Sequence, residues 1–528
     1  MVDRVAFSCN GHAVEVETEI GESLLNVLRE RLGLVGAKDG CAPQGQCGCC
    51  TVLVDGEPRV ACVTPATRVA GRVVTTIEGL AEGARERAAA AFVATGGSQC
   101  GFCTPGIVMR FAGERARDVD RSLAAHLCRC TGWLTVRNAV EEDAPGGARD
   151  LAAATRRAEL EGGIAQQVGP AVPLGGAPFA DDTAPRDALV AVPLPPGSTA
   201  PFVEAAGLCW VVGESLLDAR AAAAKVQGRR TTVDPSPPLL ERMPACPDGG
   251  VQLATQWVEP AYLEPDASWC APGGVAASPL ANGGAFGGKL HSRAPVAARE
   301  LADRLGRAVR VVYSREDVVR LGPKRPPIAA VAVARGNTVE IDGVIARGTG
   351  TPQIWPVSDG LEIRARWEAV DVAGPPVSSE LRAVGLAEQA MLVAGALGRD
   401  IDVLTPSGAR AAARVELDGT RVARVAVSVA AGEPLDEIVL RSYAIGAAHM
   451  ALGWITSEGL AVDRHSGEVH DLTIRSFGVL RAVDTPHIDV TVVDDPAPAR
   501  ARATDAVFGA VAAAAWNALG RPVTLPHR

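Results

Sequence analysis

The sequence has few aromatic residues and no excess of positive charge. Phe, Trp and Tyr make up 4% of the 528 residues, which argues against broad surfaces for stacking nucleic-acid bases. Lys and Arg number 52 against 61 Asp and Glu, and the formal net charge of −9 also argues against nucleic-acid binding. A run of about 20 apolar residues is absent, and residues 1–20 alternate like a strand instead of showing the regions of a signal peptide. We therefore expect a cytoplasmic protein without a membrane span.

The length and the hydrophobic content predict several packed domains. Hydrophobic residues make up 47%, which suffices for ordinary buried cores, and 528 residues correspond to three or four domains at roughly 150 residues each. Local patterns predict a sheet with one helix at 22–32 in residues 1–78, with a strand at 51–54 that turns at Asp55-Gly56. They also predict helices in 79–140 and a charged, Gly- and Ala-rich linker at 141–163. Strands and helices alternate in 164–275 and in 276–528, with one helix at 294–305.

Ten of the thirteen cysteines lie before residue 131, and in a long chain without a secretion signal they indicate metal or redox chemistry rather than disulfides. The first group follows the spacing C-x5-C-x2-C inside the glycine-rich stretch GCAPQGQCGCC, with a fourth cysteine twelve positions on. This is one residue longer in its first gap than the plant-type [2Fe-2S] pattern. Zinc remains the alternative, because four thiolates also suit a tetrahedral site. The expected ligands are Cys41, Cys47, Cys50 and Cys62, with Cys49 as a bystander.

The second group consists of two close pairs in a helical region. Its stretches are QCGFCTPG and HLCRCTGW, and C-x-C is too tight for an ordinary zinc knuckle but common in iron-sulfur binding. Two pairs at the ends of facing helices would bring four sulfurs together. The expected ligands are Cys100, Cys103, Cys128 and Cys130.

The order and the sequences of both cysteine groups resemble those in the iron-sulfur subunit of the xanthine dehydrogenase/aldehyde oxidase family of molybdenum hydroxylases. The resemblance implies a multidomain α+β fold, with a β-grasp ferredoxin-like [2Fe-2S] domain at 1–78 and a four-helix [2Fe-2S] domain at 79–140. Shortened α/β molybdopterin-subunit-like domains would follow, hammerhead-like at 164–275 and molybdopterin-binding-like at 276–528. The resemblance also implies that Gln99 hydrogen-bonds the pterin.

Several later stretches resemble the same family's large, molybdopterin-binding subunit. GGAFGGK at 283–289 and GPPVSSELRAVG at 374–385 carry the residues expected at the cofactor. GGAFGGK also fits a P-loop spacing, but Leu290 stands where a P-loop needs Ser or Thr, which argues against nucleotide hydrolysis. The expected cofactor-binding residues are Gly284, Phe286, Gly287 and Arg382.

The catalytic base of this family has no clear counterpart here. Molybdenum hydroxylases use a carboxylate, usually a Glu near the C-terminus, and the corresponding stretch RATDAVFGAVAAAAW holds no Glu. Asp505 is a weak candidate, with a shorter side chain. Glu433, in Gly-Glu-Pro, lies upstream of the expected place, and His449, which replaces the family's Gln, is more typical of a packed side chain.

Three functions are compatible with these patterns. The first is an iron-sulfur electron-transfer subunit, which passes electrons from a molybdenum centre through two [2Fe-2S] clusters to a flavin or another acceptor. Its partners would be a molybdopterin-binding catalytic subunit and an FAD-binding subunit in a hetero-oligomer, with residues 164–528 as the partner-binding surface. Alternatively, the chain binds molybdopterin itself and hydroxylates an aldehyde or N-heterocycle. The third is a non-catalytic assembly scaffold, against which eight well-placed thiols argue.

Overall fold

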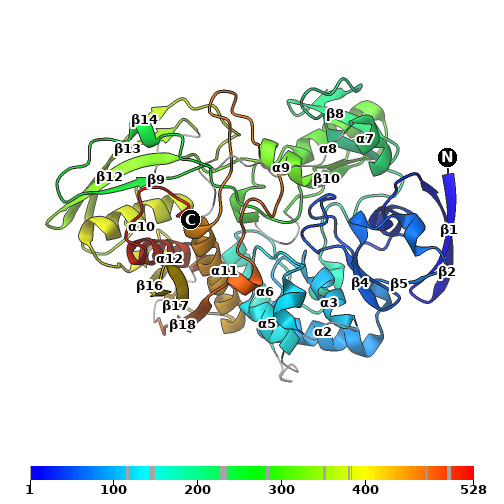
Figure 1. Cartoon of the computed structure of the whole chain (residues 1–528), viewed down its shortest axis with the longest axis horizontal. Helices are drawn as coiled ribbons and strands as arrows, with labels where there is room; N and C mark the ends of the chain where they lie inside the picture. Colours follow the sequence, from blue (N-terminus) through cyan, green and yellow to red (C-terminus); the bar gives the residue numbers. More distant parts are fainter. Residues whose placement is uncertain are drawn as a thin grey trace.

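The chain folds into four sheets with helices between and beside them. A computed structural model describes residues 2–113, 118–141, 149–224, 235–280, 282, 285–348, 353–378, 381, 383–470, 472–495 and 501–527. The amino-terminal sheet lies at one end of the molecule and the sheet that contains β12–β14 lies at the other (Figure 1). The observed architecture is the mixed α and β arrangement that the sequence predicts.

The first sheet has the order β2-β1-β5-β3-β4. A short helix with a wider last turn crosses it at 24–31, and Leu24 and Leu28 are completely buried there. Asp55 (φ 51°) and Gly56 (φ 77°) form the turn after β3, as the Asp-Gly pair predicts. The elements are β1 Val2–Cys9, β2 His12–Glu19, α1 Leu24–Asn26 with the turn Val27–Arg31, β3 Thr51–Val54, β4 Glu57–Val60 and β5 Val73–Thr75.

Helices follow this sheet, as the sequence predicts. The region contains α2 Glu82–Thr95, α3 Thr104–Ala112, α4 Val119–Leu123 and α5 Leu134–Glu141. Pro105 stands in the first turn of α3, where its missing N–H costs nothing, so the helix begins directly after Cys103.

The predicted linker 141–163 lies partly outside the described residues, and its described part contains a packed helix, α6 Leu151–Gly162. Asp150 caps the helix by accepting hydrogen bonds from two backbone N–H groups. Arg157 and Glu161 are completely buried and pair with each other, and Glu161 accepts a hydrogen bond from the N–H of Thr504. Two charged residues of the predicted linker therefore form a buried ion pair within a packed helix.

The second sheet has the order β10-β11-β6-β8-β7. The predicted boundary at 275/276 falls inside this sheet, because β10 and β11 pair across it. Helix α8 spans Ala294–Leu305, as predicted, and buries Leu301 against the sheet. The elements are β6 Leu189–Pro193, β7 Val203–Ala205, β8 Leu208–Gly213, α7 Leu216–Ala222, β10 Ala267–Cys270, α8, β11 Val309–Val312 and α9 Arg315–Leu321.

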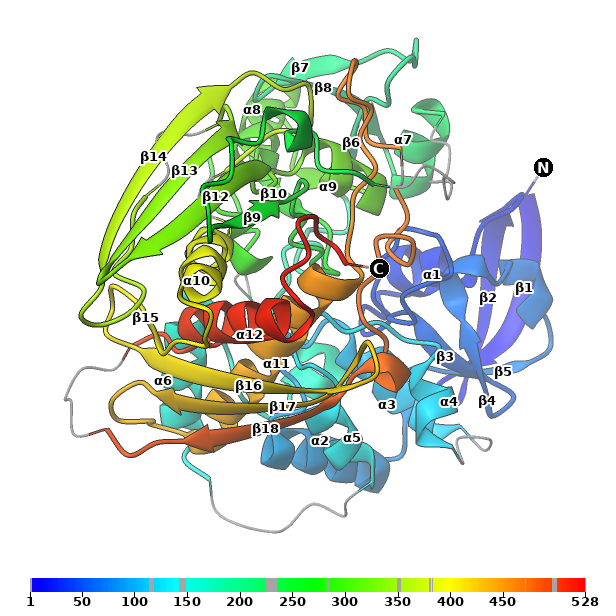
Figure 2. The same cartoon turned by 60° about the vertical axis from the view of Figure 1, so that its left-hand side comes forward.

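Two further sheets enclose three apolar helices (Figure 2). The sheet β14-β13-β12-β9 comprises β9 Val251–Ala254, β12 Ile328–Arg335, β13 Thr338–Ala346 and β14 Glu362–Val370. The sheet β15-β16-β17-β18 comprises β15 Val403–Leu404, β16 Arg410–Asp418, β17 Arg421–Ala430 and β18 His487–Val492. The helices are α10 Val384–Leu397, α11 Glu437–Thr456 and α12 Thr504–Ala518.

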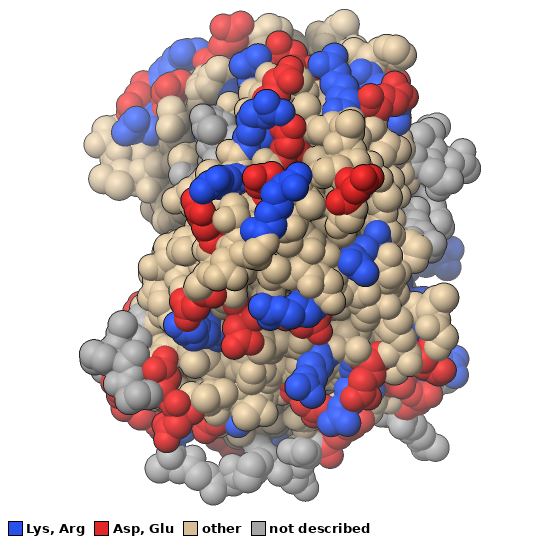
Figure 3. All heavy atoms as spheres, turned by 90° about the vertical axis from the view of Figure 1, so that its left-hand side faces the viewer, with Lys and Arg blue, Asp and Glu red and all other residues tan. Residues whose placement is uncertain are grey.

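Helix α11 is long and apolar enough to cross a membrane by length and composition, the one such helix among the described residues. However, 83% of its apolar stretch is buried inside the protein, which is typical of a core helix. On the face seen in Figure 3, acidic and basic side chains are interspersed, and neither sign gathers into one patch.

Small residues let α11 approach the second cysteine group closely. A Cβ atom at Gly446 would overlap the carbonyl oxygen of Cys130, so only glycine permits this contact. One turn later, the side chain of His449 lies against Gly132. The carboxyl-terminal half therefore packs directly on the cysteine-bearing helices.

We expect Gly446→Ala to lower the free energy of unfolding by about 1–3 kcal/mol, because the added methyl group forces the helix and the cysteine loop apart. Thermal or denaturant unfolding measures the change. Gly83→Ala in α2 is the matched control, because only the end of a flexible arginine lies near that position. Equal stability of Gly446→Ala and the wild type would show that the two halves do not pack this closely.

Candidate functional site

The first cysteine group is buried beneath a loop that points backbone N–H groups at sulfur. The N–H groups of Gln44 and Gln46 lie 3.3 and 3.5 Å from the Cys41 sulfur, and that of Cys62 lies 3.4 Å from the Cys50 sulfur. Such N–H groups stabilise thiolate and cluster sulfur. The four predicted ligands are between 1% and 6% exposed and are Cys41, Cys47, Cys50 and Cys62.

Thiol contacts join all four members of this group. Hydrogen bonds from Cys47 and Cys62 lower the pKa of Cys41, and a hydrogen bond joins Cys62 to Cys50. The four thiols therefore lie in one continuous chain of contacts. The Cys49 thiol points to the Cys47 carbonyl oxygen at 3.9 Å.

The second group divides into two pairs. The sulfurs of Cys100 and Cys130 lie 3.6 Å apart. A hydrogen bond from Cys103, together with one from Thr131, lowers the pKa of Cys128 to about 6. Cys103 precedes α3, while Cys128 and Cys130 lie in the turn before α5, so the two helices bring the pairs together.

Four thiols in each group supply the ligands that a binuclear cluster needs. Each iron of a [2Fe-2S] cluster takes two thiolates, whereas a structural zinc ion needs four donors around one point. The second group presents its thiols as two separate pairs. The donor chemistry of both groups therefore fits [2Fe-2S] clusters.

The two cysteine loops lie directly against each other. The N–H of Leu127 donates a 2.9 Å hydrogen bond to the Cys47 carbonyl oxygen. A Cβ at Gly48 would come within 2.5 Å of the His126 ring, and a Cβ at Gly106 in α3 would overlap the Gly48 carbonyl oxygen. Glycine at both positions is what allows the first group to approach the second.

The carboxyl-terminal half covers the second group through polar contacts. Gln99 is 9% exposed, and its amide donates to the backbone oxygen and the hydroxyl of Ser442 on α11 at 3.1 and 3.0 Å. Asn282 donates to the Cys100 carbonyl oxygen at 2.9 Å. Gln99, which the resemblance assigns to a pterin, is thus engaged in holding α11.

A buried ion pair that the sequence analysis missed joins the second group to the end of α11. Arg129, between Cys128 and Cys130, forms a bidentate pair with Glu458, and its Nε donates to the Pro260 carbonyl oxygen at 3.0 Å. Burial raises the pKa of Glu458 while Arg129 opposes the shift. No local pattern marks this pair, because 329 residues separate its members.

Little room exists where the resemblance places the molybdopterin. Phe286 and Gly287 adopt left-handed backbone conformations (φ 53° and 85°) in a tight turn. Phe286 lines two spaces, each with about 40 Å³ open to water, whereas small-molecule sites measure about 300–1,000 Å³. Gly284 and Arg382 lie outside the described residues.

Of the remaining candidate residues, Asp505 lies at a small space beside Phe286, whereas Glu433 lies elsewhere. Asp505 lines one of the two small spaces, together with Glu458, and lies 3.8 Å from Arg502. Glu433 is exposed and lies in the turn before α11. Burial and the charge of Arg129 lower the pKa of His449 to about 3, which keeps it neutral.

The lysine of the P-loop-like stretch is also engaged elsewhere. Lys289 is 1% exposed, and its ammonium group pairs with Glu264 at 2.8 Å and donates to the Pro265 carbonyl oxygen at 3.3 Å. It therefore holds the turn in place and is not available to a phosphate.

Comparisons with known proteins agree with this geometry. Residues 7–71 match the family model of a 2Fe-2S iron-sulfur cluster binding domain, and residues 76–141 match that of a [2Fe-2S] binding domain. The xanthine dehydrogenase iron-sulfur-binding subunit of Escherichia coli O157:H7 is 38% identical over 141 residues, which cover 25% of this chain and 87% of that protein. The nicotinate dehydrogenase small FeS subunit of Eubacterium barkeri is 34% identical over 144 residues, which cover 26% and 91%.

The fold of the whole chain is similar to a solved structure. Aldehyde oxidoreductase from Desulfovibrio gigas aligns with a TM-score of 0.73 at 15% identity, over 99% of each chain. The two domains and the two groups of four thiols define an iron-sulfur electron-transfer protein with two [2Fe-2S] clusters. The chain belongs to the xanthine dehydrogenase/aldehyde oxidase family of molybdenum hydroxylases, and it is an oxidoreductase component of that family.

We expect Glu458→Gln to lower the free energy of unfolding by about 3–5 kcal/mol, because the buried charge of Arg129 loses its partner. Denaturant unfolding measures the loss. Glu437→Gln, which removes an exposed ion pair with Arg441 on the same helix, is the control and should change stability by at most about 1 kcal/mol. If both variants were equally stable, the Arg129–Glu458 pair would not hold the two halves together.

Proposed function

We propose that the chain is the electron-transfer subunit of a molybdenum hydroxylase complex, with the molybdopterin in a partner subunit. Cys41, Cys47, Cys50 and Cys62 would hold one [2Fe-2S] cluster, and Cys100, Cys103, Cys128 and Cys130 the other. The observation that carries the proposal is the gathering of four thiols in each group, as a chain of contacts in the first and as two pairs in the second. Each cluster, when bound, takes up and releases one electron.

The residues around the thiols support this role by excluding water and fixing the loops. Cys47, Cys50 and Cys128 are each 1% exposed. The hydrogen bond from Leu127 to Cys47 locks the two loops in contact, and a short separation favours electron transfer between the clusters. The second group, with the less buried Cys100 and Cys130, lies beneath the carboxyl-terminal half.

The partner assignment is supported by what surrounds Phe286. The two spaces of about 40 Å³ hold a few water molecules and not a pterin. The stretch expected to carry the catalytic Glu holds only Asp505. The two relatives, whose names describe them as iron-sulfur subunits of nicotinate and xanthine dehydrogenases, support a complex with a catalytic subunit and with an FAD-binding or other acceptor subunit.

A second candidate is that the chain itself holds molybdopterin and hydroxylates an aldehyde or N-heterocycle. The whole-chain fold similarity to aldehyde oxidoreductase favours it. It would require α11 to move away from Phe286 and Gln99 to give up its bonds to Ser442.

Purified anaerobically, the chain should contain about four iron atoms and give two distinguishable electron paramagnetic resonance signals when reduced. Cys47→Ser should abolish one signal and Cys103→Ser the other, because each removes a ligand from a different group. Cys49→Ser is the matched control and should keep both signals. Zinc in place of iron, or the loss of a signal in Cys49→Ser, would contradict the ligand assignment.

The isolated chain should hold no stoichiometric molybdenum and should oxidise aldehydes or purines at least about 10²- to 10⁴-fold more slowly than a complete complex, because it lacks the usual base. Metal analysis and turnover of the chain, alone and co-expressed with its partner subunits, measure this. Stoichiometric molybdenum with full turnover in the single chain would establish the second candidate instead.

A further inference from the structure

The carboxyl-terminal half also reaches the first cysteine group, through the segment 472–475. The loop 42–46, which lies between the first two cysteines of that group, is one residue longer than in the plant-type pattern. The Gln44 amide donates to the carbonyl oxygen of Leu472 at 3.3 Å and accepts from the N–H of Ile474 at 3.4 Å. The longer loop is therefore held by backbone groups that lie 428 to 430 residues further along the chain.

Arg475 fixes the end of the same loop. Its backbone N–H donates to the side-chain oxygen of Gln46 at 3.1 Å, and its Nε donates to the Gln46 carbonyl oxygen at 3.0 Å. Its guanidinium group also donates to the carbonyl oxygen of Ala124 at 3.0 Å, in the turn before the second group. Because the Gln46 N–H points at the Cys41 sulfur, Arg475 holds a residue that contacts a proposed cluster ligand.

The charge of Arg475 is not neutralised by a carboxylate. Among the residues that the structure describes, no Asp or Glu pairs with it, and both guanidinium bonds go to neutral carbonyl oxygens. Burial and the charge of Arg481 lower the pKa of Arg475, whereas Cys47 and Cys41 raise it. A guanidinium group stays protonated in proteins. A full positive charge therefore lies within electrostatic reach of two proposed ligands of the first cluster.

The second group has the opposite electrostatic setting. Arg129 lies between two of its cysteines, but Glu458 pairs with it through both carboxylate oxygens. Both side chains are buried, so water does not screen the pair. Each cysteine group thus has one arginine beside it, and the carboxyl-terminal half neutralises the arginine of the second group while it supplies that of the first.

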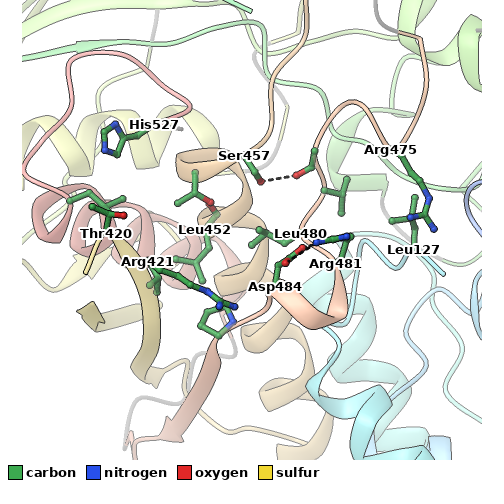
Figure 4. A pocket seen from close by; sticks show the side chains of 16 residues that line it. Leu127, Thr420, Arg421, Leu452, Ser457, Arg475, Leu480, Arg481, Asp484 and His527 are labelled. Atoms are coloured by element: carbon green, nitrogen blue, oxygen red, sulfur yellow. Dashed lines mark hydrogen bonds and ion pairs between the residues drawn. The ribbon is translucent and has the colours of Figure 1, made fainter. Parts of the chain in front are cut away.

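Arg475 reaches the cysteine loops from the wall of a cavity of about 870 Å³. In Figure 4 its side chain lies at the same end of this cavity as that of Leu127, whose N–H donates to the Cys47 carbonyl oxygen at 2.9 Å. Arg481, further along the same segment, pairs with Asp484, which neutralises its charge. Of these two arginines, Arg475 is the one that combines an unneutralised charge with contact to the first cysteine group.

We propose that Arg475 is a positioning residue for electron transfer, which raises the reduction potential of the first cluster relative to that of the second. The inference rests on the proposed function, because both clusters must be bound for their potentials to differ. Reduction adds one negative charge to a [2Fe-2S] cluster, and a nearby positive charge stabilises the reduced form. An electron shared between the two clusters would therefore favour the first.

Redox titration of the holoprotein, followed by electron paramagnetic resonance, measures the potential of each cluster, and the signals are assigned with Cys47→Ser and Cys103→Ser. Arg475→Gln should shift the distribution of the electron about three- to tenfold toward the second cluster. This corresponds to a first-cluster potential that is lower by about 28–59 mV. Arg464→Gln is the matched control and should leave both potentials unchanged, because Arg464 contacts Glu241 and Ser236 and not a cysteine loop.

Two further measurements separate the charge of Arg475 from a merely structural role. Arg475→Lys keeps the positive charge but not the guanidinium geometry, and it should restore at least about half of the lost potential. Raising the ionic strength to 1 M shortens the Debye length to about 3 Å. Because Arg475 is exposed, the difference in potential between the wild type and Arg475→Gln should then become smaller.

The outcomes separate this inference from the proposed function. Equal first-cluster potentials in the wild type and Arg475→Gln, or an Arg475→Lys variant shifted as far as Arg475→Gln, would overturn the inference while both signals remain. Missing iron or missing signals in the wild type would overturn the proposed function before any titration.

The wild type alone decides the question if Arg475→Gln does not retain the first cluster. Added salt should lower the potential of the first cluster more than that of the second, because the charge of Arg475 is exposed whereas Arg129 is already neutralised by Glu458. Equal responses of the two potentials to salt would overturn the inference.

Discussion

The contact between the two cysteine loops is the constraint on which the rest of the structure depends. The Leu127–Cys47 hydrogen bond and the glycines at 48 and 106 hold the loops together. Any side chain at either glycine would push the thiol groups apart. The first group is thereby closed off by the helices, and the second is fixed at the surface that the carboxyl-terminal half covers. Electron transfer between clusters needs this short and rigid separation.

The carboxyl-terminal half packs on the second cysteine group from outside. Gln99 binds Ser442, Arg129 binds Glu458, and Gly446 lets α11 touch the Cys130 carbonyl. These contacts occupy residues and space that a pterin would need. The carboxyl-terminal half therefore covers the second cysteine group and provides a docking surface rather than a cofactor-binding pocket.

Local features were predictable from the sequence because their signals are short-range. The strand Thr51–Val54, the helix Ala294–Leu305 and both cysteine groups follow from periodicity, turn residues and spacing. Helix α6 was not predictable, because a stretch with a buried Arg157–Glu161 pair has the same composition as a solvated linker. The pairing of Glu458 with Arg129 could not be foreseen either, because tertiary folding brings together segments that lie hundreds of residues apart.

The distance between the clusters is the quantity that tests this account most directly. Electron paramagnetic resonance of the fully reduced protein at low temperature detects the magnetic interaction between two neighbouring [2Fe-2S] clusters. The contact between the loops predicts split or broadened signals, and Cys47→Ser should leave the remaining signal sharp. Two sharp, simply additive signals in the fully reduced wild type would contradict the account, because the cysteine loops would then lie too far apart to interact.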